Sequence, residues 1–318
     1  MSPSVRPATT IAKPKALRTG ARLAAFAPAS PADESRIAAG FAELKRLGFS
    51  VGNDLARGPQ GYFAAPASER HAELLSKLRD DRVDGLVALR GGYGSNYLLD
   101  DRLAASLREP KSIVGFSDVT SLQIFLWEYR GWVSFYGPMI AAGFDAGAGT
   151  PGGYDEASFR SAVSSTQAGW DIPLSGETLV AGDAKGCLLG GAMTLVEATI
   201  GTPWELDTRE AILVLEDRAM KPYQVDRVLM HLKHADKFAG LRAIILGEFP
   251  GCQPPVAGSP TVRDVCKRIL GPLGIPILFG APVGHTERAM LTLPLGVQAR
   301  LVAKGEGVLE VLEPAVVR

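Results

Sequence analysis

The stretch that decides the fold reads Ser112-Ile113-Val114-Gly115-Phe116-Ser117-Asp118. Its first five residues are a largely apolar run that predicts a buried strand, and apolar side chains then recur at helical spacing from Leu122 to Tyr129. Ser117 is therefore expected on a strand-to-helix turn, where backbone N–H groups lack acceptors and the helix dipole is positive. An oxyanion formed there would be stabilised, so Ser117 is a candidate nucleophile. Taken alone, Ser and Asp before a helix more often form a cap.

The residues before this stretch alternate between strand and helix patterns. Strands are expected at Leu23–Phe26, Phe49–Val51 and Gly85–Leu89, with amphipathic helices between them. This alternation predicts a parallel sheet covered on both faces. The third strand runs into a glycine-rich loop, Arg90-Gly91-Gly92-Tyr93-Gly94. That loop and the Ser117 turn both follow carboxyl ends of parallel strands, where open α/β sheets bind their ligands.

The 318 residues are enough for two domains. We expect a disordered tail at 1–20, a nucleophile domain at 21–150, a linker at 151–184 and a second domain at 185–318, because glycines gather from 143 to 153 and polar segments continue to about 184. The second domain shows strand patterns at Ala211–Leu215 and Arg242–Leu246 with a helix at Val225–Leu232. After Ile275, short strands separated by Gly and Pro indicate a β-rich, partly barrel-like domain.

The composition excludes several classes of function. Thirty-four basic and thirty-four acidic residues give no net charge, so no global field attracts nucleic acid or an anionic membrane, and a small molecule or peptide is the better ligand. No apolar run approaches the ~20 residues that span a bilayer. The odd number of cysteines, three, matches no metal or redox spacing and favours reduced thiols. We therefore expect a soluble, cytoplasmic protein. The acid-free first twenty residues resemble a transit peptide, but a tail is the simpler interpretation.

A serine nucleophile needs a base, and the chain holds only four histidines. His71 lies in a polar helical stretch and is expected in solvent. His231 and His234 share a helix face at a spacing that can hold a metal, but no third ligand follows nearby, so both are interpreted as surface residues. His285 lies in a turn bounded by Gly and Pro, and loops carry catalytic residues disproportionately. Glu216 ends an apolar run and could be solvated or could orient an imidazole.

Six separated motifs then resemble one family in the right order from about Leu23 to the C-terminus. The motifs are Arg90 to Gly94; Gly115-Phe116-Ser117-Asp118; Gly186-x-x-x-Gly190-Gly191; Gly201-Thr202-Pro203-Trp204; Leu215-Glu216-Asp217 with Pro222-Tyr223 and Asp226-Arg227; and Gly284-His285. Together they look like the L,D-carboxypeptidase family, which includes the microcin C7 self-immunity proteins. The resemblance implies a metal-independent serine peptidase that needs no cofactor.

The resemblance also assigns roles to residues. It implies a triad of Ser117, Glu216 and His285, with the serine on a flavodoxin-like N-terminal domain and the other two on a C-terminal β-rich, barrel-like α/β domain. The active site would then lie between the domains. The N–H groups of Gly92 and Asp118 would form the oxyanion hole, and a loop that approaches the reacting carbonyl so closely needs glycine. The glycine loop lacks the third glycine of a dinucleotide fingerprint and has no Gly-Lys-Ser/Thr, so a phosphate site is not expected.

Four further residues are expected to border the substrate: Gly91, Tyr93, Tyr136 and Ala192. The last two depart from the family, because many members have histidine before the Gly137-Pro138 pair and asparagine after the Gly190-Gly191 pair. The resemblance implies a murein tetrapeptide L,D-carboxypeptidase of peptidoglycan recycling, acting as a homodimer on a small peptide that ends in D-alanine. The alternatives are a microcin-type hydrolase of aminoacyl-nucleotide amides, for which Trp170 or Trp204 could hold an adenine ring, and a non-catalytic binding module.

Overall fold

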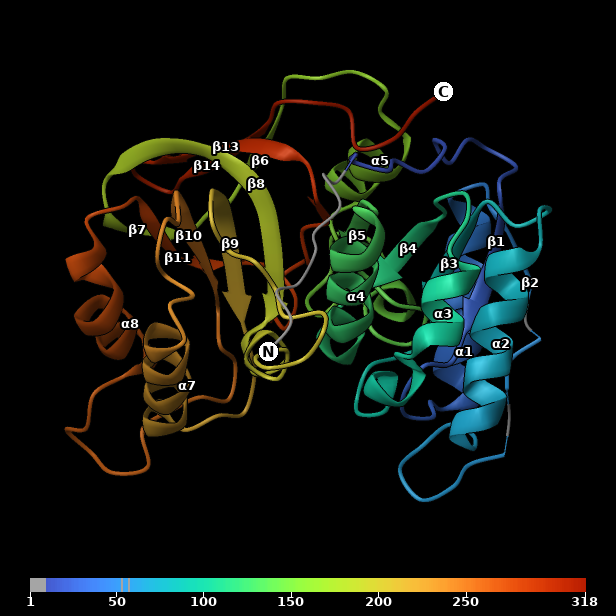
Figure 1. Ribbon diagram of the computed structural model, residues 1–318, viewed down its shortest axis with the longest axis horizontal. Helices are drawn as coiled ribbons and strands as arrows, with labels where there is room; N and C mark the ends of the chain where they lie inside the picture. Colours follow the sequence, from blue (N-terminus) through green and yellow to red (C-terminus); the bar gives the residue numbers. More distant parts are fainter. Residues whose placement is uncertain (1–9, 53, 57) are drawn as a thin grey trace.

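The computed structural model describes residues 10–52, 54–56 and 58–318. Two mixed α/β lobes lie side by side, each built on its own sheet (Figure 1). We call them the N-terminal lobe and the C-terminal lobe. No helix in the described part of the chain is long and apolar enough to cross a membrane.

The N-terminal lobe is built on a six-stranded sheet in the order β12-β5-β4-β3-β1-β2. Its strands are β1 (Arg22–Phe26), β2 (Ser50–Gly52), β3 (Gly85–Ala88), β4 (Ser112–Gly115), β5 (Ser134–Tyr136) and β12 (Leu293–Leu295). The first five strands are parallel, as the alternating pattern predicted, and every residue of β3 and β4 is buried. A continuous apolar run of this kind is typical of a parallel strand with both faces covered.

Helices and short 3₁₀ turns connect the strands of this lobe. They are α1 (Glu34–Arg46), α2 (Ala67–Arg79), α3 (Asp101–Ser106) and α4 (Thr120–Arg130), with η1 (Ser95–Leu98), η2 (Ser117–Val119) and η3 (Phe144–Ala146). The helix α4 faces the C-terminal lobe and contacts its strand β8 (Figure 1). It ends at Gly131, which has a φ of 61° and so caps the helix in the left-handed conformation that glycine adopts without strain.

The C-terminal lobe is built on an eight-stranded sheet in the order β6-β14-β13-β8-β9-β10-β11-β7. Its strands are β6 (Trp170–Pro173), β7 (Glu177–Val180), β8 (Gly182–Ala192), β9 (Ala211–Glu216), β10 (Ala243–Gly247), β11 (Ile277–Ala281), β13 (Gln298–Ala303) and β14 (Val308–Val311). Strands β8 to β11 are parallel and form the centre, while the outer strands pair antiparallel. The remaining helical elements are α5 (Glu156–Ser164), α6 (Met193–Glu197), α7 (Pro222–His234), α8 (Val262–Leu270) and η4 (Gly271–Leu273).

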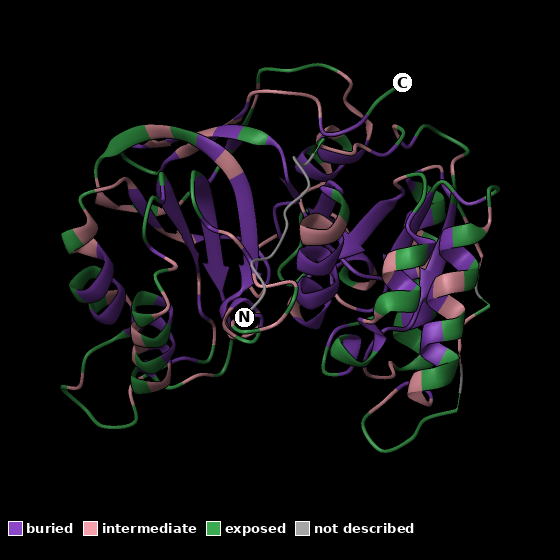
Figure 2. Ribbon diagram, in the orientation of Figure 1, coloured by how far each residue is buried: buried purple, intermediate pink, exposed green. Residues whose placement is uncertain are grey.

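The hydrophobic core continues from one lobe into the other. The buried strands occupy the middle of each lobe, and exposed residues line the outer faces of the helices (Figure 2). Ile124 of α4 is 3% exposed and packs in the same cluster as Met193 of α6 and Leu213 of β9. Burial of apolar surface favours association by about 25 cal/mol per Å², so this shared cluster holds the two lobes together.

The range 151–184, expected as a linker, contains α5, β6 and β7. Both strands join the C-terminal sheet at its two edges. In the other direction, β12 lies late in the sequence yet pairs antiparallel with β5 of the N-terminal lobe. The polar composition of 151–184 reflects edge strands with one exposed face, which a local pattern does not separate from a loop.

The expected tail needs a correction over its second half. Residues 1–9 lie outside the described residues. From residue 10 on, the chain runs along the body of the protein: Ala12 N–H donates to Gly131 O at 2.8 Å and Ala16 N–H to Val317 O at 2.8 Å. Leu17 is 1% exposed. The buried side chain of Leu17 and the paired backbone groups stabilise the ordering of this segment, and its short, weakly patterned sequence does not reveal these contacts.

Candidate active site

Ser117 lies at a sharp turn between β4 and α4. It has a φ of 62°, a left-handed value that is uncommon for a residue with a side chain. The turn continues as η2, in which Val119 N–H donates to Phe116 O at 3.3 Å and Thr120 N–H donates to Ser117 O, and then as α4. Non-glycine residues in this conformation cluster at functional sites, because the surrounding structure must hold them there. The strand-to-helix turn predicted from the sequence is confirmed.

The glycine loop after β3 touches this turn. A Cβ placed on Gly91 would lie 2.9 Å from Ser117 Cβ, 3.0 Å from Ser117 Oγ and 3.5 Å from Asp118 N. Gly92 is exposed, with a φ of 109° that side chains rarely adopt. The two N–H groups expected to bind an oxyanion, those of Gly92 and Asp118, thus come from adjoining loops at the same edge of the sheet.

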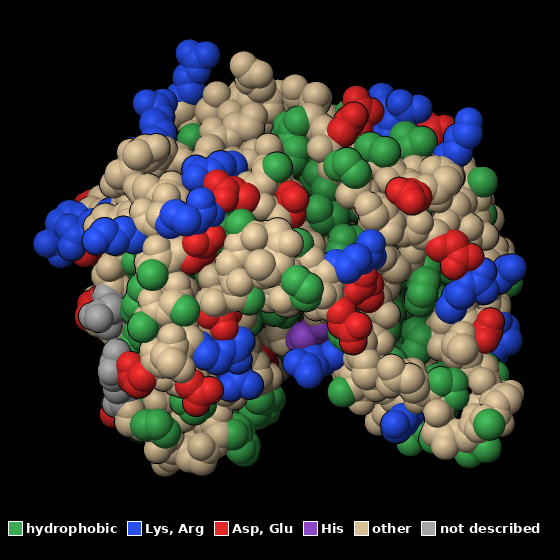
Figure 3. All heavy atoms as spheres, turned by 180° about the vertical axis from the view of Figure 1, so that it is seen from behind, with side chains coloured by type: hydrophobic (Ala, Val, Ile, Leu, Met, Phe, Trp, Pro, Cys, Tyr) green, Lys and Arg blue, Asp and Glu red, His purple; other side chains and the backbone are tan. Residues whose placement is uncertain are grey.

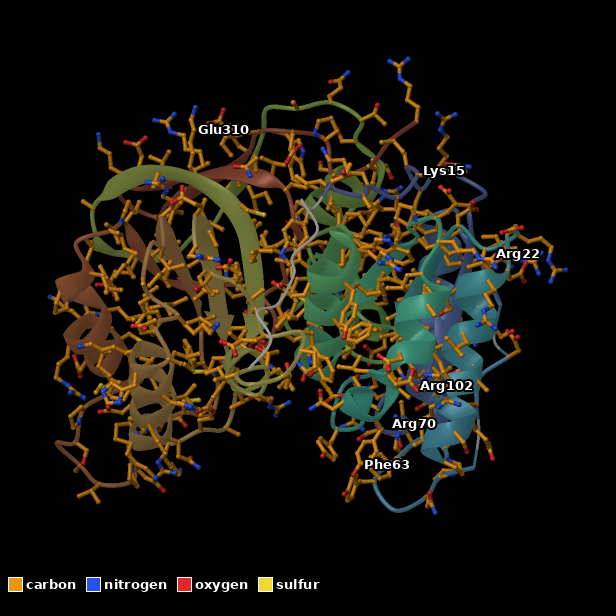
Figure 4. The ribbon with its side chains drawn as sticks, in the orientation of Figure 1. Lys15, Arg22, Phe63, Arg70, Arg102 and Glu310 are labelled. Carbon is orange, nitrogen blue, oxygen red and sulfur yellow. The ribbon has the colours of Figure 1, made fainter. Side chains whose placement is uncertain are left out.

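Two buried charged residues, Asp118 and Arg70, form hydrogen bonds with the backbone of these loops. The Asp118 carboxylate accepts a 2.7 Å hydrogen bond from Ser95 N–H, and burial raises its pKa while the nearby Arg70 guanidinium opposes that rise. Arg70 is 1% exposed and donates to Gly94 O at 2.9 Å and to Pro28 O. Its guanidinium carbon lies 4.9 Å from the centre of the Phe63 ring. Figure 4 shows Arg70 on α2, next to Phe63. Sequence analysis missed Arg70, because an arginine on a helix is usually solvated.

Glu216 and His285 form a direct pair. Glu216 ends β9 and is fully buried. Its Oε2 lies 2.8 Å from His285 Nδ1 and accepts the His285 backbone N–H at 2.9 Å, while Oε1 lies 3.2 Å from Nδ1. A carboxylate next to Nδ1 favours the tautomer with hydrogen on that nitrogen, which leaves Nε2 free to accept a proton.

The pair lies beside the nucleophile turn. The His285 ring packs edge-on against Phe116, the residue before Ser117, with ring centres 5.1 Å apart. Tyr136 of β5 connects Glu216 to the nucleophile turn: its hydroxyl donates to Glu216 Oε1 at 2.5 Å and accepts Ser117 N–H at 3.3 Å. The described residues contain no hydrogen bond between the Ser117 hydroxyl and the His285 ring, and such bonds often tighten only when substrate is bound.

Seen from behind, the molecule has a notch between the lobes, with a histidine and a basic side chain at its closed end (Figure 3). His285 keeps 12% of its side chain exposed, so the imidazole reaches solvent although its carboxylate partner does not. The sequence motifs on the two halves of the chain therefore meet at one place, between the lobes.

The expected substrate contacts of Tyr136 and Ala192 need a correction. Tyr136 is fully buried and Ala192 is 1% exposed. Ala192 N–H donates to Thr120 Oγ1 at 3.1 Å, across the lobe interface. Both residues thus lie next to Glu216 in the packed interface, Tyr136 through its hydrogen bond and Ala192 as the partner of Glu216 in the register of β8 and β9. Tyr93, at 44% exposed, and Gly91 lie on the loop that contacts Ser117, and their contact with substrate stays a prediction.

The other histidines take different positions. His71, expected in solvent, is 4% exposed and its Nε2 lies 2.9 Å from Asp100 Oδ1, so that interpretation is wrong: α2 turns this face toward the N-terminus of α3. His231 is half exposed and its Nδ1 lies 2.8 Å from Glu197 Oε1. Within the described ranges, no group of three His, Cys, Asp or Glu side chains could hold a metal ion.

Replacing Gly284 by alanine should damage the site without touching a reacting atom. Gly284 has a φ of 61°, and an added Cβ would lie 2.5 Å from Glu216 Oε1. Glu216 would have to move, and for the catalytic role that the family resemblance implies for it, a displacement of about 1 Å costs roughly a hundredfold in rate. We expect kcat to fall by that order in a peptidase assay. Gly305→Ala is the control, since Gly305 has a φ of 60° with nothing within 4 Å of its added Cβ. Equal kcat values for both variants would contradict the prediction.

Comparison with known proteins identifies the family. Residues 23–137 match the LD-carboxypeptidase N-terminal domain and residues 185–301 match the LD-carboxypeptidase C-terminal domain. The chain is 33% identical over 299 residues to a probable murein peptide carboxypeptidase of Bacillus subtilis, covering 91% of each chain. It is 27% identical over 306 residues to the microcin C7 self-immunity protein of Escherichia coli, covering 86% of this chain and 87% of that protein.

Solved structures agree in fold. The muramoyltetrapeptide carboxypeptidase of Oxalobacter formigenes superposes with a TM-score of 0.80 at 29% identity, covering 92% of this chain and 99% of that one. The microcin C7 self-immunity protein in complex with glutamyl sulfamoyl guanosine superposes with a TM-score of 0.82 at 23% identity, covering 95% and 99%. Both family domains match in order along one chain, and their lobes meet where the motif residues gather. This protein therefore belongs to the LD-carboxypeptidase family of serine peptidases.

Proposed function

We propose that this protein is a murein tetrapeptide L,D-carboxypeptidase that releases the C-terminal D-alanine by a Ser117–His285–Glu216 triad. The observation that carries the proposal is the Glu216–His285 pair beside the turn that bears Ser117. The named relative from Bacillus subtilis supports the substrate class, since it is called a murein peptide carboxypeptidase. The cytoplasmic location of the protein and its assembly as a homodimer stay predictions.

The reaction follows from the positions of these groups. His285 Nε2 accepts the Ser117 hydroxyl proton as Oγ attacks the carbonyl carbon of the last peptide bond. The Gly92 and Asp118 N–H groups bind the oxygen that becomes negative. The imidazolium then gives its proton to the departing amine of D-alanine, and the acyl group stays on Ser117 as an ester. Water then gives a proton to His285 and attacks the ester carbon. His285 returns that proton to Ser117 Oγ as the bond between Oγ and the acyl carbon breaks, which releases the shortened peptide with a free carboxylate. Glu216 stabilises the imidazolium each time it forms.

The microcin-type alternative would require an aromatic platform for a nucleobase. Trp204 is only partly buried but packs edge-on against Phe125 of α4, with ring centres 5.4 Å apart. Trp170 lies on the edge strand β6, with β14, β13 and β8 between it and the strand that carries Glu216. Among the described residues the ring that contacts His285 is Phe116, so neither tryptophan is in ring contact with the pair, and these two expected platforms do not support the microcin-type reaction.

The purified protein should release D-alanine from a murein tetrapeptide and should discriminate between epimers at the last residue. The bond cut joins an L-centre to a D-residue, and a pocket shaped for that arrangement should disfavour the L-alanine epimer by more than tenfold in kcat/KM, about 1.4 kcal/mol. The measurement is the initial rate of alanine release from both peptides at several concentrations.

The same assay should include an aminoacyl sulfamoyl adenosine as a third substrate. Equal turnover of the two epimers would contradict the L,D assignment. Hydrolysis of the adenosine compound with no action on either peptide would keep the triad but assign the protein to the microcin-type reaction. Ser117→Ala serves as the blank, because alanine released by it at a rate comparable to that of the wild type would come from a contaminating peptidase.

A further inference from the structure

Tyr136 is the residue through which the two halves of the site meet. It is the last residue of β5 in the N-terminal lobe and is fully buried. Its hydroxyl oxygen lies 2.5 Å from Glu216 Oε1 of the C-terminal lobe and 3.3 Å from Ser117 N. One oxygen atom thus contacts both the carboxylate that holds the histidine and the backbone of the nucleophile.

We propose that Tyr136 is a positioning residue of this peptidase: its hydroxyl holds the Glu216 carboxylate in the orientation that presents Oε2 to His285. The inference rests on the proposed function, in which His285 is the base. It concerns a residue that touches neither substrate nor the reacting atoms.

The direction of the hydrogen bond follows from the inventory of donors. A phenol has one hydrogen, and Ser117 N–H is itself a donor, so the phenol hydrogen can point only to an acceptor such as Glu216. Burial raises the pKa of Tyr136 well above its usual value, and the negative charge of Glu216 raises it further. Tyr136 therefore stays protonated and donates to Glu216 at every pH at which a histidine can titrate.

The carboxylate orientation then follows. Oε1 accepts the phenol hydrogen, and Oε2 accepts both the backbone N–H and the ring of His285. Among the described side chains, only Tyr136 and His285 donate to Glu216. Without the phenol, Oε1 would be a buried acceptor that keeps only the longer 3.2 Å contact with Nδ1, and the carboxylate would be free to rotate about its last bond.

Close backbone approach fixes the ring of Tyr136 in place. A Cβ added at Gly191, which has a φ of 140°, would lie 3.0 Å from the Tyr136 ring and 2.7 Å from the Thr120 side chain. Only a glycine of β8 permits this approach. The tyrosine is therefore held by both lobes before any substrate binds, as a positioning residue must be.

The effect on pH dependence has a definite sign. The charged and titratable groups around Glu216 are Tyr136 of β5, His285 after β11, the adjacent Asp217, and Cys252 after β10. Burial raises the pKa of Asp217 and of the Cys252 thiol, and Glu216 adds to both shifts. Loss of the phenol donor destabilises the charged carboxylate, so the Glu216–His285 pair binds a proton more tightly, whichever member carries it. The acid limb of the rate profile must then move to higher pH.

The test is Tyr136→Phe, compared with Tyr154→Phe as a matched control. Tyr154 is also fully buried and its hydroxyl donates to a glutamate, Glu43, at 2.7 Å, but on α1 of the N-terminal lobe. Tyr136→Phe should lower kcat at neutral pH by about tenfold or more with a smaller change in KM, and should move the acid limb of kcat/KM upward by about half a unit or more. Tyr154→Phe should leave the profile in place. An unshifted acid limb in folded Tyr136→Phe, or equal shifts in both variants, would overturn the proposal.

A second measurement needs neither turnover nor a correct substrate. In the Ser117→Ala background, the NMR titration midpoint of the His285 ring should rise when Tyr136→Phe is added and should not move when Tyr154→Phe is added. If this titration midpoint rises but the wild-type protein shows no peptidase activity, the positioning role is kept and the proposed substrate is rejected. If Tyr136→Phe does not fold, the test uses the NMR signal of the Tyr136 hydroxyl proton in the otherwise unaltered chain, which is assigned by its disappearance in Glu216→Gln. The chemical shift of this signal should change as His285 titrates. A signal whose shift does not change would reject the role.

Discussion

Ser117→Ala should lower kcat for the D-alanine tetrapeptide by roughly 10⁴- to 10⁶-fold, because no other group can form the acyl-enzyme. The variant should fold, since alanine keeps the Cβ that already occupies the left-handed turn at a φ of 62° and only one hydroxyl is lost. Residual turnover would come from the oxyanion-binding amides acting on water. Steady-state release of D-alanine measures the loss, and circular dichroism with thermal denaturation reports the fold.

Ser175→Ala provides the matched control for this variant. Ser175 is the other described serine with a left-handed backbone, at a φ of 47°, and it lies between β6 and β7 of the C-terminal lobe. Its replacement makes the same chemical change at the same kind of backbone position and should leave kcat intact. A Ser117→Ala enzyme that retains more than about a hundredth of wild-type turnover would reject Ser117 as the nucleophile.

Glu216→Gln should have the second largest effect, a loss of roughly 10³- to 10⁴-fold in kcat. The carboxylate accepts three donors, the Tyr136 hydroxyl and the backbone and ring N–H groups of His285. A glutamine turns one of its two positions into a donor, so either Tyr136 or His285 N–H then faces another donor. A ring that flips its tautomer to accept from the amide presents N–H to Ser117 instead of a free nitrogen, and the imidazolium loses its counter-charge.

Glu73→Gln is the matched control for loss of a buried carboxylate. Glu73 of α2 is 6% exposed in its side chain and accepts the N–H groups of Ala27 and Ala56 at 2.9 Å, besides pairing with Lys77. Its replacement should lower the melting temperature without a comparable loss of kcat. A Glu216→Gln enzyme within tenfold of wild type, with a pH profile that has not moved, would contradict the role assigned to Glu216.

Local sequence chemistry predicted the nucleophile lobe closely. The expected strands Leu23–Phe26, Phe49–Val51 and Gly85–Leu89 correspond within a residue or so to β1, β2 and β3. The turn at Ser117 is also local, because a buried apolar run followed by a helix start leaves little choice of where the chain bends. The sequence signal behind these predictions is local, because it is the pattern of apolar and polar residues close together in the chain.

Composition was a poor guide where the chain pairs at long range. Residues 151–184 are polar, yet β6 and β7 complete the two edges of the C-terminal sheet. The strand β12 crosses back to pair with β5 of the other lobe. His71 was expected in solvent, but it is buried against Asp100. These pairings depend on which distant surfaces become buried together, and no local pattern encodes that.

The sequence by itself determined the elements, the order of the motifs and the residue types of the chemistry: a serine on a turn, a glutamate ending a strand and a histidine in a loop. Only the tertiary structure decided that Glu216 and His285, 69 positions apart, form a pair beside Ser117, and that Tyr136 is buried against Glu216. The physical reason is that the site lies between two lobes. The geometry of the site depends on how surfaces that are far apart in the chain pack against one another, and no single segment contains that information.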